Sequence, residues 1–151
     1  MILMPRAPGR ILALDVGKKR VGLAVSDPLG ITAQGLPTLH RVRIREDLDF
    51  LADLCSEYEV TTILIGRPLH MSGDESNQGR YTAEFGDRLA QRTGLPVEYL
   101  DERLTSVQAG RMLREAGAST DRRTGSVDRM AAMLLLQSYL DTVPHPEDSL
   151  D

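Results

Sequence analysis

The chain has 151 residues, a formal net charge of −4, 41% apolar residues and a single cysteine, Cys55. This length fits one domain with its own hydrophobic core, and one cysteine excludes a disulfide framework and a cysteine-based zinc site. No stretch approaches the roughly 20 apolar residues of a membrane span, and the 4% aromatic content argues against a stacking platform for bases. We expect a cytoplasmic protein with no membrane partner, built as a flexible leader (1–9), one domain (10–141) and an acidic tail (142–151).

The apolar pattern predicts alternating strands and helices. In chain order it predicts two hairpin strands (11–17 and 21–26), an edge strand (30–38), a helix from Ile44, a buried strand (60–66), a loop (67–79), a helix ending at Gly94, a short strand (97–100), a helix from Thr105 to Gly117 and a last helix from Ser126. Five strands interleaved with helices in this order predict a three-layer α/β fold with a mixed five-stranded sheet flanked by helices.

Acidic residues occur where two predicted strands end and where the last helix begins. Asp15 ends the first buried strand, Asp101 and Glu102 end the last strand, and Asp128 lies in the first turn of the final helix. Ligands of such sheets bind at the carboxyl ends of the strands. Carboxylates converging there would repel one another unless a divalent cation lay between them. Each has a plainer interpretation: a turn carboxylate for Asp15, an ion pair with Arg103 for the pair, and a helix-dipole contact for Asp128.

Only one member of the 101–102 pair can face the site, because neighbours in a strand point to opposite faces. Strict alternation groups Glu102 with Glu98 and Leu100 and favours Glu102, while Asp101 is the alternative if the strand has already ended. Oxygen ligands alone suit Mg²⁺ or Mn²⁺ and suit zinc poorly. Two such ions can activate water for phosphodiester hydrolysis. The sequence thus predicts a catalytic metal site of Asp15, Glu102 and Asp128, with Asp101 as a further candidate.

Basic residues flank these acids. Lys18, Lys19 and Arg20 follow the first strand, and Arg122 and Arg123 precede Asp128. Lysine and arginine at such positions are typical of phosphate contacts. The charge pattern is therefore compatible with a nucleic-acid partner bound through these five side chains, although it does not require one.

Four blocks resemble the YqgF (RuvX) family: Leu14–Asp27, Ile65–Gly73, Asp101–Ser106 and Val127–Ala132. They occur in family order and span nearly the whole chain. The resemblance implies a ribonuclease H-like fold, trimming of the 5′ end of pre-16S ribosomal RNA during ribosome biogenesis, and acidic site residues at the positions found above. The family was earlier associated with Holliday-junction resolution.

Two residues depart from the family pattern. Arg67 stands where an apolar residue is usual, and His70 where Asn is common, so substrate contacts of this loop are transferred less safely. His70 is a candidate general base, although a loop histidine is more often a polar surface residue.

The sequence therefore predicts a metal-dependent nuclease that binds nucleic acid, with RNA favoured and branched DNA as the alternative. A junction resolvase needs a two-fold dimer, whereas a monomer or weak homodimer could trim one RNA strand. Two other classes stay open. The Asp15-Val16-Gly17 turn also resembles the first phosphate loop of actin-like and sugar kinases, although these need two such domains, and a catalytically silent nucleic-acid-binding module would share the basic residues.

Overall fold

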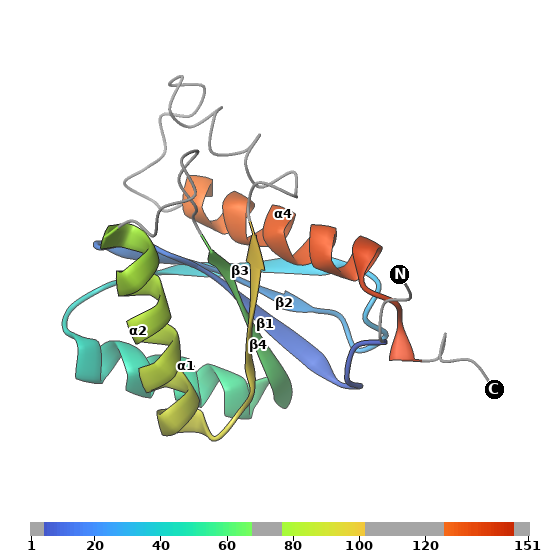
Figure 1. Ribbon diagram of the computed structural model, residues 1–151, viewed down its shortest axis with the longest axis horizontal. Coiled ribbons are helices and arrows are strands. Elements are labelled where there is room, and N and C mark those ends of the chain that lie inside the picture. Colours follow the sequence, from blue (N-terminus) through green and yellow to red (C-terminus); the bar gives the residue numbers. More distant parts are fainter. Residues whose placement is uncertain (1–4, 68–76, 102–125, 147–151) are drawn as a thin grey trace.

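The computed structural model describes residues 5–67, 77–101 and 126–146. Its elements are β1 (Arg10–Val16), β2 (Arg20–Ser26), β3 (Ala33–His40), α1 (Ile44–Glu57), β4 (Val60–Arg67), α2 (Asn77–Thr93), β5 (Val97–Asp101) and α4 (Ser126–Thr142). The sheet order is β3-β2-β1-β4-β5, with β1, β4 and β5 parallel and β2 and β3 joined to them by antiparallel pairing. The predicted mixed five-stranded sheet is confirmed (Figure 1). No described helix is long and apolar enough to cross a membrane.

Several predicted boundaries differ from the structure by one to three residues, most clearly around the third strand and the loop expected over 67–79. The third strand begins at Ala33 instead of residue 30, because the Asp27 carboxylate accepts hydrogen bonds from the backbone N–H groups of Leu29, Ile31 and Thr32 and holds a turn there. The loop expected over 67–79 is shorter at both ends: β4 pairs with β5 as far as Arg67, and α2 begins at Asn77. The helix predicted from Thr105 lies outside the described residues.

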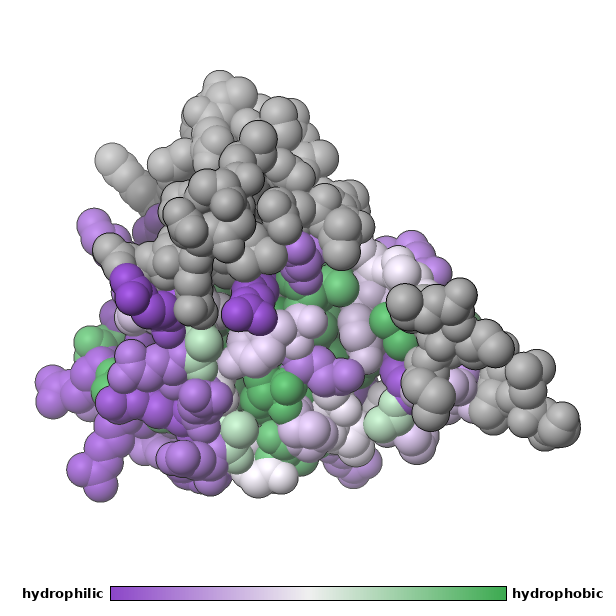
Figure 2. Space-filling view, in the orientation of Figure 1, coloured by the Kyte–Doolittle hydropathy of each residue, from purple (hydrophilic) through white to green (hydrophobic). Residues whose placement is uncertain are grey.

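The sheet separates two apolar layers (Figure 1). On one face α1 and α2 cover alternate strand residues, with Leu51, Cys55, Phe85 and Leu89 in the core. Burial raises the pKa of Cys55 to about 11, so this thiol is a core residue and stays protonated at neutral pH. The exposed side of α2 is hydrophilic, as Figure 2 shows, which fits a helix that buries a single stripe.

On the other face of the sheet, α4 lies close to the strands because small residues line both sides of this interface. Ala13 and Ala24 of the sheet face Ala132 of α4 in one buried cluster. At the start of α4 the approach is closer still: a Cβ built on Gly22 of β2 would overlap the backbone carbonyl of Asp128. Glycine inside a strand commonly marks such a close backbone approach. Gly22 therefore sets how near the first turn of α4 lies to the sheet.

Arg41, on the side of the sheet covered by α1 and α2, holds the turn between β1 and β2 in place. Its Nη1 donates to the carbonyl of Gly17 at 3.1 Å, and its backbone N–H donates to the carbonyl of Lys19 at 2.9 Å. Its Nε donates to the nearly inaccessible Asp47 carboxylate at 2.9 Å. The guanidinium also lies 5.0 Å from the ring centre of Phe85. A buried, paired charge thus fixes the turn that follows Asp15.

Gly22→Ala is expected to destabilise the fold by about 3 kcal/mol, at the upper end of overpacking costs, because the obstructing atom is backbone and cannot rotate away. Gly35→Ala is the matched control, since the added methyl meets only the flexible side chains of Arg129 and Met133 on the same helix. Urea unfolding of both variants measures the difference. Equal losses would mean that Gly22 does not limit the approach of α4.

Arg41→Met is expected to cost about 3–5 kcal/mol, because it leaves the Asp47 carboxylate buried without this counter-charge. The double variant Arg41→Met/Asp47→Leu should recover part of that loss. Arg43→Met, which removes an exposed partner of Glu46, should leave stability nearly unchanged. Chemical denaturation of the set tests this, and additive losses in the double variant would contradict a coupled pair.

Candidate active site

Asp15 is the penultimate residue of β1 and is buried, with 3% of its surface exposed. It lies directly opposite Gly22 in the antiparallel register, and directly opposite residues share a face of the sheet. Ile11 and Ala13, on the same face by alternation, belong to the cluster covered by α4. The Asp15 side chain therefore emerges on the α4 face, at the carboxyl end of a central strand.

Asp128 lies in the first turn of α4, where an acid is favoured by the helix dipole. Its backbone lies directly over Gly22, and the Cα atoms of opposite residues such as Gly22 and Asp15 are about 4.5–5.5 Å apart. The backbones of two predicted acidic residues, 113 positions apart in the sequence, thus lie near each other on the α4 face of the sheet.

Arg20 joins them as an ion pair with Asp128. Its Nε donates to Oδ2 of Asp128 at 3.1 Å, and the two side chains are 28% and 15% exposed. Sequence reasoning assigned Arg20 to phosphate contact and did not foresee this partner. No local pattern links the two residues, since the contact depends on where α4 crosses β2.

The alternation of side chains along β5 shows which face Asp101 occupies. Asp101 is the last residue of β5 and pairs with Arg67. Tyr99, two residues earlier and so on the same face, lies against Gly86 of α2, whereas Glu98 accepts a hydrogen bond from Tyr139 of α4 at 2.8 Å. Asp101 therefore lies on the α2 face, away from Asp15, and it is still within the strand. Glu102 lies outside the described residues.

The described part of the chain contains no group of three His, Cys, Asp or Glu side chains that could hold a metal ion. It does contain Asp15 and Asp128, two of the three predicted ligands. Their donor atoms are carboxylate oxygens, which are the ligands that Mg²⁺ and Mn²⁺ prefer. This part of the site fits Mg²⁺ or Mn²⁺.

Of the predicted phosphate contacts, Lys18 and Lys19 are exposed in the turn between β1 and β2, beside this acidic edge. Arg122 and Arg123 lie outside the described residues, as does His70. The described residues thus supply a basic turn that directly follows Asp15.

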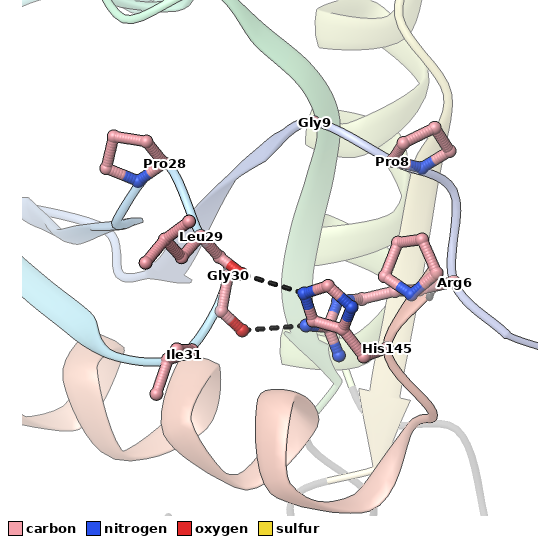
Figure 3. Close-up of a pocket in the computed structure, with 9 residues that line it drawn as sticks. Arg6, Pro8, Gly9, Pro28, Leu29, Gly30, Ile31 and His145 are labelled. Carbon is pink, nitrogen blue, oxygen red and sulfur yellow. Dashed lines mark hydrogen bonds between the residues drawn. The ribbon is translucent and has the colours of Figure 1, made fainter. Parts of the chain in front are cut away.

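A pocket of about 460 Å³ lies at the opposite edge of the sheet, beside the start of β1 and the end of β2 (Figure 3). Its polar side chains bind backbone: Arg6 donates to the carbonyls of Gly30 and Val143, and His145 bonds the carbonyl of Leu29. Arg6, within the predicted leader, is thereby packed against the end of α4. These bonds join the segment before β1 to the turn after β2 and to the segment after α4, and the pocket holds none of the predicted site residues.

Comparison with a solved structure supports the fold. The structure of RuvC from Thermus thermophilus in complex with a Holliday junction substrate aligns with a TM-score of 0.56 and 14% identity, covering 87% of this chain and 93% of that chain. At this identity the likeness concerns the fold alone, and it confirms the predicted ribonuclease H-like architecture.

Sequence relatives are much closer. A protein of Clostridium novyi named "Putative pre-16S rRNA nuclease" is 46% identical over 134 residues, covering 89% of this chain and 99% of the relative. A relative of the same name from Koribacter versatilis is 50% identical over 133 residues, covering 88% and 87%. The family described as "RuvX: Holliday junction resolvase" matches residues 9–142. The chain belongs to the RuvX (YqgF) family.

Proposed function

We propose that this chain is a divalent-metal-dependent nuclease that trims the 5′ end of pre-16S ribosomal RNA. The observation that carries the proposal is the meeting of Asp15 and Asp128 on one face at the carboxyl end of β1, next to a basic turn. The names of the relatives support the same substrate. Ribosomal RNA processing would take place in the cytoplasm.

In this proposal Asp15, Asp128 and Glu102 hold Mg²⁺ or Mn²⁺. The bound ions would activate a water molecule and stabilise the leaving oxygen of the phosphodiester. Asp15 supplies a rigid ligand, because it belongs to a central strand paired on both sides and the turn after it is tied to Arg41. Asp128 supplies a second ligand whose position depends on the backbone contact at Gly22. Glu102 is preferred over Asp101 because Glu98 and Leu100 lie on the α4 face.

Substrate binding is assigned to the bases around the acidic edge. Lys18 and Lys19 are exposed directly after β1 and can contact phosphates on either side of the cleaved bond. Arg122 and Arg123 are proposed to extend this surface, whereas Arg67 lies opposite Asp101 on the α2 face and is not included.

A Holliday-junction resolvase is the second candidate function, because the family description names that activity. Resolution requires two active sites placed symmetrically on opposing strands, hence a two-fold dimer. A monomer suffices to trim a single RNA strand. The oligomeric state and the cleavage pattern therefore distinguish the two functions.

Asp15→Asn is expected to lower cleavage more than about 100-fold, since loss of even an outer-shell partner of a metal ligand commonly costs 10–100-fold. The variant should melt in EDTA at or above the temperature of the unmodified protein, because a buried charge has been removed. Asp53→Asn, on the exposed side of α1, is the control. Activity in Mn²⁺ together with thermal melting measures both effects. Near-normal cleavage by Asp15→Asn would refute the assignment.

The substrate test offers the purified protein a pre-16S leader RNA and a mobile four-way DNA junction in the same Mn²⁺ buffer, with its mass measured in solution. We expect cleavage of the RNA, inhibition by EDTA and no paired nicks in the junction. Symmetric junction nicks by a stable dimer, with the RNA intact, would establish the resolvase instead. ATP hydrolysis without cleavage of either substrate would favour a phosphotransferase.

A further inference from the structure

The Arg20 side chain donates a hydrogen bond to a carboxylate oxygen of Asp128, which is a ligand in the proposed metal site. Arg20 begins β2, and its position is fixed by backbone: its carbonyl accepts the N–H of Gly17 at 2.9 Å, and the neighbouring Lys19 carbonyl accepts the N–H of Arg41. From this turn the Nε reaches Oδ2 of Asp128 at 3.1 Å. The ion pair is therefore a built contact between β2 and α4.

This contact competes with a cation. A guanidinium bound to Asp128 neutralises part of the charge that a divalent ion would use, and it occupies one of the two carboxylate oxygens. Both side chains are mostly shielded from solvent, which strengthens the pairing relative to a surface ion pair. Without substrate, Arg20 would thus lower the affinity of the site for metal.

Nucleic acid offers Arg20 another partner. Guanidinium groups bind phosphate through paired N–H donors as well as they bind carboxylates. Arg20 directly follows the exposed Lys18 and Lys19, where the phosphate backbone is proposed to lie. A phosphate at this turn could therefore draw the guanidinium away from Asp128.

We propose that Arg20 is a positioning residue that couples metal binding to nucleic-acid binding: it pairs with Asp128 in the free protein and with a substrate phosphate in the complex. The inference rests on the proposed function, since it takes Asp128 as a metal ligand. Linkage makes the coupling reciprocal: RNA raises the affinity for metal by the same factor by which metal raises the affinity for RNA.

The experiment measures Mn²⁺ affinity by calorimetry, and by the electron paramagnetic resonance signal of free Mn²⁺, with and without a short phosphorothioate RNA. The proteins are the unmodified chain, Arg20→Gln and Lys19→Gln. Lys19→Gln is the matched control, because it removes one positive charge from the adjacent, exposed position of the same turn. Thermal melts in EDTA verify that each variant is folded.

We expect the RNA to tighten Mn²⁺ binding to the unmodified protein by roughly 5–150-fold, the usual range for coupled sites. Arg20→Gln should bind Mn²⁺ more tightly in the absence of RNA and lose most of the coupling. Lys19→Gln, which removes a proposed phosphate contact and is therefore measured at saturating RNA, should keep the coupling. If RNA leaves the Mn²⁺ affinity of the unmodified protein unchanged, the inference is overturned whether or not Arg20→Gln folds.

The remaining outcomes separate this inference from the proposed function. Equal Mn²⁺ affinities and equal coupling in Arg20→Gln and Lys19→Gln would overturn the role of Arg20 and leave the metal site standing. Absence of Mn²⁺ binding in all three proteins, with and without RNA, would overturn the metal site and the inference together.

Discussion

The close approach of α4 to the sheet at Gly22 is the contact on which the candidate site depends. Because Gly22 has no side chain, the backbone of Asp128 lies directly against β2, at the position opposite Asp15. The small residues Ala13, Ala24 and Ala132 continue this thin layer along the helix. A larger residue at position 22 would move the first turn of α4 outward and separate the two carboxylates. The absence of a side chain at Gly22 thus allows β2 and α4, which are distant in the sequence, to pack closely. Asp15 and Asp128 are held near each other by this backbone contact.

The turn from Gly17 to Arg20 lies between two ion pairs. On the α1 and α2 side, Arg41 bonds Asp47 and the Gly17 carbonyl; on the α4 side, Arg20 bonds Asp128. The first pair is almost fully buried and fixes the backbone, while the second is partly accessible. This division fits the roles proposed for the turn, which would be rigid next to Asp15 and adaptable at Arg20. Burial decides which pair is structural, since breaking a buried pair costs far more than breaking an accessible one.

The functional conclusion combines two independent lines. The family and its relatives indicate a nuclease, and the geometry places two acids and a basic turn at the edge of the sheet where α/β proteins bind ligands. The likeness to RuvC adds the architecture, a ribonuclease H-like sheet, and at 14% identity adds nothing about substrate. At the pocket on the opposite edge, the side chains of Arg6 and His145 bind backbone carbonyls of Val143 and Leu29.

Local pattern alone determined most of the elements: apolar runs predicted the strands, and helical spacing predicted α1, α2 and α4. Position within those elements also singled out Asp15 and Asp128 as candidate site residues. Local pattern misplaced the start of β3 and the ends of the 67–79 loop, since the Asp27 turn and the β4–β5 pairing extend beyond any one apolar run. Only the tertiary structure decided that Arg20 pairs with Asp128, that Arg41 clamps the turn after Asp15, and that Gly22 is a contact point. Each of these three contacts is between residues distant in the sequence. They are close in space because of the strand order β3-β2-β1-β4-β5 and the way α4 crosses the sheet. Periodicity carries no information about that order, because it records which face of an element is buried and not which element covers it.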